Sequence, residues 1–294
     1  ANGQSFETFA AGDPQAPLLL FLHGFPEHAR AWEKILPAFA DKYYAVAPNQ
    51  RGYGQSSKPT GIENYRVQHL AKDMLDLAGT LAPGKKIHLV AHDWGASVAY
   101  MMAFMAHARI ATLTVLNGVH PIPFQRAILS DREQRQASQY MRFLRRDDAA
   151  PLLAESNYAR LMAFMTGGFG GGRWMTDAER DQYLVNWSES GALEAMVSWY
   201  KATQLTVPKV DEIVTDDPLA RINPTMVRVR VPHLVLWGEE DKALRPSCID
   251  GLETFCDDLR IKKVAGADHW IVHQRPDIVI PEIHSFLKSH EGTL

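Results

Sequence analysis

The fold of this 294-residue chain can be deduced from the stretch Ile87-His-Leu-Val-Ala-His-Asp-Trp-Gly-Ala96. An apolar run of strand length leads to Asp93, and apolar residues at helical spacing follow it. Ala91 and Gly95 stand two positions before and after Asp93, which leaves the room that a sharp turn from strand to helix requires. Such a turn lifts its central side chain above the sheet, beside the free N–H groups of the new helix. Because Asp is also a common N-cap, this stretch alone leaves a structural and a catalytic role open.

The segments around this stretch alternate between strand-like and helix-like patterns. Short runs rich in Val and Leu, without alternating polarity, predict buried strands at Leu18–Leu22, Tyr44–Ala47, Ile87–Ala91 and Leu113–Leu116. Apolar residues at three- and four-residue steps predict a helix over Val67–Leu81. The alternation returns later, with two strands and a closing helix near Pro232–Trp237, Arg260–Ala265 and Pro276–His290. It predicts an α/β fold with a mainly parallel sheet and helices on both faces.

The middle of the chain differs from both ends. From about Pro121 to Pro224 no strand-like run occurs, and Tyr, Trp and Met stand at helical spacing instead. We therefore expect one α/β core, formed by residues 1–120 and 224–294, and a helical insertion at residues 121–223. The glycine-rich segment 167–172 lacks the Gly-Lys-Ser/Thr ending of a phosphate loop, so it predicts a flexible connection.

Composition and charge argue against several classes of protein. The chain is 46% hydrophobic and 22% charged, which is typical of a globular protein and not of a disordered, collagen-like or coiled-coil one. With 31 Lys and Arg against 34 Asp and Glu, the formal net charge is −3 and no long run of one sign occurs, so we expect no nucleic-acid partner. The longest apolar runs are far shorter than the ~20 residues of a membrane span, so we expect no membrane association.

The cysteines and histidines indicate neither a disulfide framework nor a metal site. Cys248 and Cys256 lack the spacing of zinc and redox motifs. His88 and His92 are separated by four strand residues, or ~13 Å, which is too far for one metal ion. We therefore expect no metal and no cofactor. Sparse cysteine use favours the cytoplasm, although a start at Ala1 leaves a removed leader open, and the oligomeric state does not follow from the sequence.

Three further segments place reactive residue types just beyond predicted strands. His23-Gly-Phe-Pro26 follows an early strand, where a backbone N–H could complete an oxyanion hole. Late in the chain, Trp237-Gly-Glu-Glu-Asp241 supplies carboxylates and Gly266-Ala-Asp-His-Trp270 supplies a histidine. The order Asp93, Asp241, His269 is that of nucleophile, acid and base in the α/β-hydrolase fold.

Six segments in this order resemble those of the α/β-hydrolase-fold epoxide hydrolases over nearly the whole chain: His23–Glu27, Arg51–Ser56, Ala91–Gly95, Trp199–Lys201, Trp237–Asp241 and Gly266–Trp270. The resemblance implies that the insertion is a cap over the core. It also implies that Asp93 is the nucleophile, that His269 is the general base and that Asp241 orients the histidine. One position departs from the family pattern, because Asn49 stands where an Asp is usual.

The same resemblance implies an oxyanion hole and a set of substrate contacts. The backbone N–H groups of Phe25 and Trp94 would form the hole, and the side chains of Phe25, Trp94 and Trp199 would line the substrate site. It further implies two cap tyrosines that donate protons, which match Tyr200 and, less closely, Tyr140. Tyr158 and Tyr183 are the alternatives.

An aspartate nucleophile restricts the reaction. A carboxylate suits displacement at saturated carbon, because the resulting alkyl ester can be cleaved by water at the enzyme's own carbonyl. Epoxides and alkyl halides meet that need, but only an epoxide oxygen leaves as a tethered alkoxide that must be protonated. Tyrosine phenols, with an ordinary pKa of about 10, can supply that proton. We therefore expect a small-molecule epoxide as substrate and a vicinal diol as product.

Several alternatives compete with this hypothesis. A dehalogenase would need halide-binding donors, for which Trp94 would serve, but Phe25 stands where many haloalkane dehalogenases carry Asn. Fluoroacetate dehalogenases carry Arg in the place of Trp94, which also favours the epoxide. A non-catalytic binding protein on the same scaffold is disfavoured, because every catalytic position is filled. For single positions, His273 competes with the base, and Glu239 and Glu240 compete with Asp241.

Overall fold

The computed structural model describes residues 1–171, 174–214 and 216–293. Its seven-stranded sheet has the order β1-β3-β2-β4-β5-β6-β7, in which β1 runs antiparallel to β3 and the other neighbours are parallel. The strands are β1 Thr8–Ala11, β2 Leu18–Leu22, β3 Tyr44–Pro48, β4 Ile87–His92, β5 Ile110–Leu116, β6 His233–Gly238 and β7 Leu259–Val264. This mainly parallel sheet confirms the predicted fold class.

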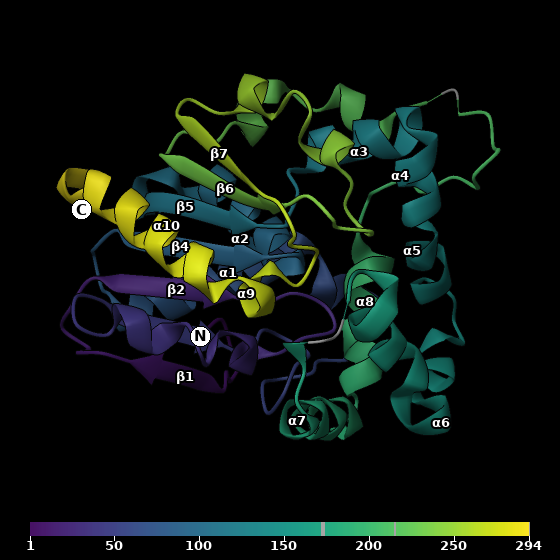
Figure 1. The fold of residues 1–294 in the computed structure, drawn as a ribbon, viewed down its shortest axis with the longest axis horizontal. Coiled ribbons are helices and arrows are strands. Elements are labelled where there is room, and N and C mark those ends of the chain that lie inside the picture. The colour runs from purple at the N-terminus through teal and green to yellow at the C-terminus, as the bar shows by residue number, and fades with distance from the viewer. Residues whose placement is uncertain (172–173, 215, 294) are drawn as a thin grey trace.

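Helices cover both faces of the sheet (Figure 1). On one face α1 (Val67–Leu81) and α2 (Trp94–Ala106) bury their apolar stripes, and on the other α9 (Ile271–Gln274) and α10 (Pro276–Ser289) do so. Successive residues of β2 point to opposite faces, so Leu20 joins the first apolar cluster and Phe21 joins the second. A strand buried on both faces needs apolar residues at every position, which explains the continuous run Leu18–Leu22.

A group of helices leaves the core between β5 and β6 and lies at one end of the sheet (Figure 1). It comprises α3 Pro121–Ser130, α4 Arg132–Ala137, α5 Gln139–Leu144, α6 Ala149–Ala163, α7 Asp177–Ser188 and α8 Ala192–Ala202. Two buried indoles tie it to core loops: Trp187 on α7 donates to the carbonyl of Pro26, and Trp199 on α8 donates to that of Arg51.

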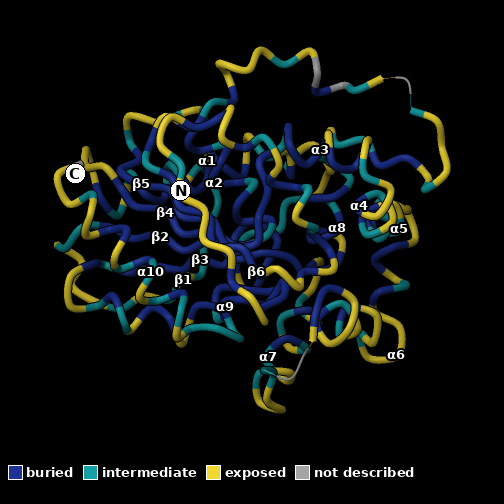
Figure 2. Tube along the Cα trace, turned by 45° about the horizontal axis from the view of Figure 1, so that its top comes forward, coloured by how far each residue is buried: buried dark blue, intermediate teal, exposed yellow. Residues whose placement is uncertain are grey.

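The register of the parallel strands decides where the loops meet. Leu22 at the end of β2 pairs with Ala91 near the end of β4, and Leu116 at the end of β5 pairs with Leu236 of β6. The carboxyl ends of the buried strands therefore share one edge, and the inserted helices lie over it (Figures 1 and 2). Side chains that directly follow these strands are consequently brought together.

None of the helices in the described part of the chain has the length and apolarity that a membrane span requires.

Candidate active site

A tight turn between β4 and α2 presents Asp93. Its backbone has φ 49° and ψ −119°, a region that non-glycine residues rarely occupy. Gly95 has no room for a side chain, since a Cβ atom there would lie 2.3 Å from the carbonyl oxygen of Leu22. A Cβ on Gly24 would lie 2.4 Å from that of Asp93. The small residues around the turn are therefore required by close approach of the β2 loop.

The two oxygens of the Asp93 carboxylate have different surroundings. Oδ1 accepts a hydrogen bond of 2.7 Å from the backbone N–H of Phe25. Oδ2 lies 3.6 Å from Nε2 of His269. Burial opposes ionisation, but the His269 imidazole, the His92 ring and the Phe25 N–H together hold the pKa of Asp93 below its ordinary value. The carboxylate is thus charged, with Oδ1 held and Oδ2 free to react.

His269 stands between two carboxylates. Its Nδ1 lies 2.7 Å from Oδ2 of Asp241, while its Nε2 has no hydrogen-bond partner among the described residues. Burial disfavours the imidazolium, but Asp241 and Asp93 outweigh burial and raise the pKa of His269 well above its ordinary value. The ring is therefore fixed by Asp241 and turned toward Asp93.

Besides the His269 ring, three donors hold Asp241. Its Oδ1 accepts the backbone N–H groups of Ala243 and Leu244, both at 2.8 Å. Its Oδ2 accepts the side-chain amide of Asn117 at 2.8 Å. Asn117 follows β5 and also accepts the N–H of Gly238. Sequence reasoning missed Asn117, although its position directly after a predicted strand was the same signal that identified the other site residues.

Two tyrosines from the inserted helices face Asp93. Tyr140 lies on α5 and Tyr200 on α8, with ring centroids 5.9 Å apart. The Tyr200 ring packs edge-on against the rings of Phe25 and Trp94. Burial, reinforced by the Asp93 charge, raises the pKa of both phenols well above the ordinary value. Both are therefore protonated at neutral pH.

Trp94, the first residue of α2, and Trp199 of α8 complete one wall. Their rings meet edge-on with centroids 5.7 Å apart. Because Trp94 is the first residue of α2, its backbone N–H has no acceptor within the helix. It is therefore free to donate a hydrogen bond in the site, beside the N–H of Phe25.

Phe169 forms another wall and was not foreseen. Its ring lies 4.7 Å from that of Tyr140 and 5.4 Å from that of His269. The carbonyl of Phe169 accepts the N–H of Lys242, and the N–H of Gly171 donates to Asp268. Within this segment Gly170 has no room for a side chain, since a Cβ atom there would lie 2.2 Å from the carboxyl carbon of Asp268, whereas nothing lies within 4 Å of a Cβ atom on Gly167. The flexible connection stays a prediction, and Gly172 lies outside the described residues.

The competing residues have other partners. His273 binds Glu27, with its Nε2 2.6 Å from Oε1, and Glu27 also binds His92. Tyr183 donates to the same Glu27 carboxylate. Tyr158 packs against Trp187, and Glu239 and Glu240 are exposed. The structure therefore brings Asp93, Asp241, His269, Tyr140 and Tyr200 together and directs these alternatives elsewhere.

The remaining polar residues singled out in the sequence support loops or strands. Asn49 accepts the N–H of Ala29 and binds Glu7, so it joins two loops of the core. His88 is hydrogen-bonded to Thr112 on the neighbouring strand. Across the described residues, no group of three or more His, Cys, Asp or Glu side chains is arranged to hold a metal ion.

Comparison with known proteins places this geometry in a family. Residues 17–276 match the family model described as the alpha/beta hydrolase fold. Epoxide hydrolase 4 of Mus musculus is 30% identical over 293 residues, which cover 98% of this chain and 77% of that protein. The AB hydrolase superfamily protein YfhM of Bacillus subtilis is 29% identical, with 98% and 96% covered.

Solved structures of epoxide hydrolases have the same fold as this chain. An epoxide hydrolase from metagenomes of hot environments has a TM-score of 0.88 at 33% identity, with 97% of this chain and 95% of that chain covered. The Bacillus megaterium epoxide hydrolase in complex with an inhibitor has a TM-score of 0.83 at 26% identity, with 98% of both chains covered. This chain belongs to the α/β-hydrolase-fold family, next to the epoxide hydrolases among its members.

Proposed function

We propose that this protein hydrolyses epoxides to vicinal diols through a covalent ester on Asp93. The observation that carries the proposal is the placement of two protonated phenols, Tyr140 and Tyr200, opposite the charged carboxylate of Asp93. The same carboxylate lies 3.6 Å from Nε2 of His269. This arrangement offers a nucleophile, acids and a base in one buried site. The substrate is a small-molecule epoxide, and no metal or cofactor takes part.

In the first half-reaction, Oδ2 of Asp93 attacks a ring carbon and the carbon–oxygen bond of the epoxide breaks. The oxygen leaves as an alkoxide and takes a proton from Tyr140 or Tyr200. Because Oδ1 is held by Phe25, Oδ2 is the oxygen that forms the ester.

In the second half-reaction, His269 removes a proton from water, which attacks Cγ of the Asp93 ester. The backbone N–H groups of Phe25 and Trp94 stabilise the oxyanion, a contribution of ~3–4 kcal/mol per donor at comparable sites. Collapse expels the diol oxygen, which takes the proton from His269. The proton left on the regenerated carboxyl group returns through solvent to the phenol.

The raised pKa of His269 fits this order of events. Two negative carboxylates favour the imidazolium in the free enzyme. Esterification removes the charge on Asp93, so the pKa of His269 falls and the ring becomes a base when a base is needed. Asp241 keeps the ring oriented throughout.

The insertion is part of the same proposal. Residues 121–223 act as a cap that delivers the two phenols, and residues 1–120 and 224–294 act as the core that carries the nucleophile and the base. A dehalogenase function is less well supported, because a halide leaves as a stable anion and would not need the two protonated phenols.

The test is to remove the base and look for the ester. His269→Gln should react once with an epoxide and stall, so intact-protein mass spectrometry should show the full mass of the epoxide added. Digestion should place the adduct on the peptide that holds Asp93. A variant that also carries Asp93→Ala is the matched control and should show no adduct.

A haloalkane offered to the same variant should leave no adduct. An adduct heavier by the haloalkane less the hydrogen halide would instead support the dehalogenase. If His269→Gln shows no adduct while the native protein turns over the same epoxide, the covalent route is wrong.

A further inference from the structure

Asp268 stands directly before His269 and joins the inserted helices to the core. The residue is 8% exposed, and both oxygens of its side chain accept backbone N–H groups. Oδ1 accepts that of Trp270 at 2.9 Å, within its own loop, and Oδ2 accepts that of Gly171 at 2.6 Å, 97 residues earlier in the chain. Neither half-reaction proposed above uses this carboxylate.

The contact between the two segments is close and has a second support. A Cβ atom on Gly170 would lie 2.2 Å from the carboxyl carbon of Asp268, so only a glycine lets the segments approach this far. The side-chain amide of Gln274 donates to the carbonyl of Gly171 at 3.3 Å, and its oxygen accepts the N–H of Asp268 at 3.0 Å. The backbone of residues 169–171 is therefore anchored to the loop that carries His269.

The side chain that this anchor holds in place is Phe169. Its ring is buried, and its centroid lies 4.7 Å from that of Tyr140 and 5.0 Å from that of Phe164, on which it stacks. The Phe164 ring also lies 6.0 Å from that of Tyr140. Because Tyr140 is only partly buried, these two rings limit how far its phenol can turn.

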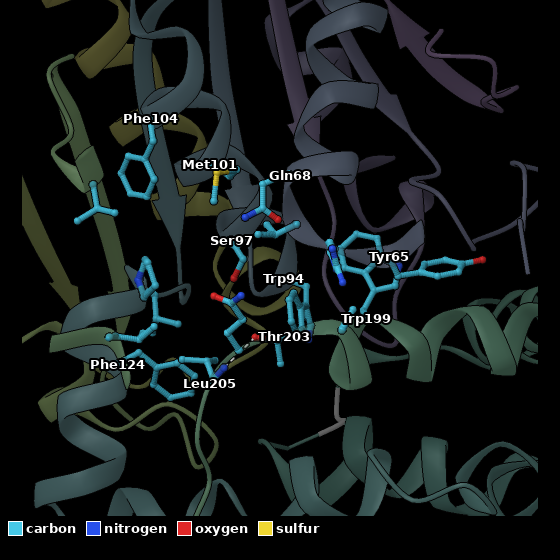
Figure 3. Close-up of a pocket in the computed structure, with 18 of the residues that line it drawn as sticks. Tyr65, Gln68, Trp94, Ser97, Met101, Phe104, Phe124, Trp199, Thr203 and Leu205 are labelled. Atoms are coloured by element: carbon cyan, nitrogen blue, oxygen red, sulfur yellow. Dashed lines mark hydrogen bonds between the residues drawn. The ribbon is translucent and has the colours of Figure 1, made fainter. Parts of the chain in front are cut away.

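The second phenol has other supports. Tyr200 is fully buried and packs edge-on against Phe25 and Trp94. Figure 3 shows Trp94 beside Trp199, whose rings meet with centroids 5.7 Å apart. Tyr200 is therefore held by rings that belong to segments other than residues 169–171.

We propose that Asp268 is a positioning residue for Tyr140: it anchors residues 169–171, and the Phe169 ring in turn holds the Tyr140 phenol toward the epoxide oxygen. The inference rests on the proposed function, in which Tyr140 is a proton donor. Because Tyr200 is supported separately, loss of the anchor weakens one donor and leaves the other. A residue that merely stabilised the loop of His269 would slow the reaction equally with either phenol.

The first test is Asp268→Asn, studied together with removal of each phenol. The amide has one oxygen in place of two and brings an N–H group against an N–H donor. Ester formation, followed by single-turnover kinetics, should slow about tenfold, less than the roughly hundredfold cost of a 1 Å displacement. With Tyr200→Phe the loss should be at least as large, because Tyr140 is then the remaining donor of the pair.

With Tyr140→Phe, Asp268→Asn should cost less than about twofold, because the group that Asp268 positions is gone. Losses of one size in the native protein and in both phenol variants would overturn the proposal. Asp268 would then act through His269 or through the stability of the fold.

The second test reaches the anchor from the other segment. Gly170→Ala leaves the carboxylate in place but forces the segments apart, so it should show the same dependence on the two phenols; a loss without that dependence would overturn the proposal. Gly167→Ala is the matched control, because nothing lies within 4 Å of a Cβ there. Asp131→Asn is the control for the carboxylate, since Asp131 also joins cap and core, through the N–H of Glu133 and the hydroxyl of Ser247. Both controls should stay within about twofold of the native rate, and circular dichroism checks that each variant is folded.

The anchor can also be tested without substrate. In hydrogen exchange followed by mass spectrometry, the peptide that covers residues 164–171 should exchange about fivefold faster in Asp268→Asn, the ratio expected when one hydrogen bond of ordinary strength is lost. Unchanged exchange would refute the anchor, whatever the activity. Faster exchange together with a native protein that opens no epoxide would refute the proposed function and confine Asp268 to holding the segment.

Discussion

Gly24→Ala tests how closely Asp93 is held by the loop that follows β2. An added Cβ would lie 2.4 Å from Cβ and 2.5 Å from Oδ1 of Asp93. Carbon atoms in contact are normally ~3.5–4.0 Å apart, so the two segments must separate by about 1 Å. This shift breaks the 2.7 Å hydrogen bond from Phe25 to Oδ1 and turns Oδ2 away from its line of attack.

A displacement of this size should lower the rate of ester formation by about a hundredfold. The assay is single-turnover opening of a fluorogenic epoxide, with thermal unfolding and circular dichroism to show that the variant is folded. Gly79→Ala is the control, because nothing lies within 4 Å of a Cβ there and the residue is inside α1. That variant should keep full activity and gain about 0.5–1 kcal/mol of stability.

The result that would refute the reasoning is a folded Gly24→Ala protein whose rate of ester formation stays within about threefold of the native rate. The Phe25 loop would then be free to move away without disturbing Asp93, and the close contact at Gly24 would not be what positions the carboxylate.

Three further predictions concern the acids and the base. Tyr140→Phe or Tyr200→Phe alone should slow ring opening about a hundredfold or less, and the double variant should nearly stop it, as single-turnover kinetics would show; undiminished opening would mean that the acid lies elsewhere. Asn117→Ala removes a donor to Asp241, so hydrolysis of the ester should slow roughly tenfold or more while its formation is little changed, which burst kinetics can separate; equal effects on both steps would contradict a role through the base. Because the pKa of His269 is raised in the folded protein, its stabilising contribution is complete below about pH 6.5 and is lost as the pH rises through the pKa of the folded state. The difference in unfolding free energy between native protein and His269→Gln, measured by urea unfolding, should therefore shrink above neutral pH. A difference that grows with pH would contradict the raised pKa.

The sequence predicts the site best where local pattern and strand order suffice. Asp93 and His269 each follow a recognisable strand or a family segment, and parallel pairing brings such positions to one edge. The two phenols were located by resemblance, because helical spacing alone shows that Tyr200 faces inward but not what it faces. Asn117 directly follows a predicted strand, so its position carried a signal, but its contact with Asp241 did not. Phe169 depended on contacts between distant segments, which no periodicity within one segment reports.

The glycine-rich segment shows a second limit. A glycine in the sequence can indicate either a flexible backbone or a position where another segment packs too closely for a Cβ atom. Only the contacts with neighbouring segments distinguish the two. At Gly170 a Cβ would lie 2.2 Å from the Asp268 carboxyl carbon, so the residue is fixed by crowding that a sequence window does not contain.

The position of His269 after β7, the last strand of the sheet, has a consequence for synthesis of the chain. A ribosome completes the nucleophile, the Phe25 loop and both phenols before it reaches the base. Under the proposed mechanism, a chain that ended before β7 yet kept its fold would hold every group that forms the ester and lack the one that breaks it. A single molecule of epoxide would inactivate such a fragment permanently. Under the same proposal, the segment after β7 is what turns a scaffold that reacts once into a catalyst that is regenerated after each turnover.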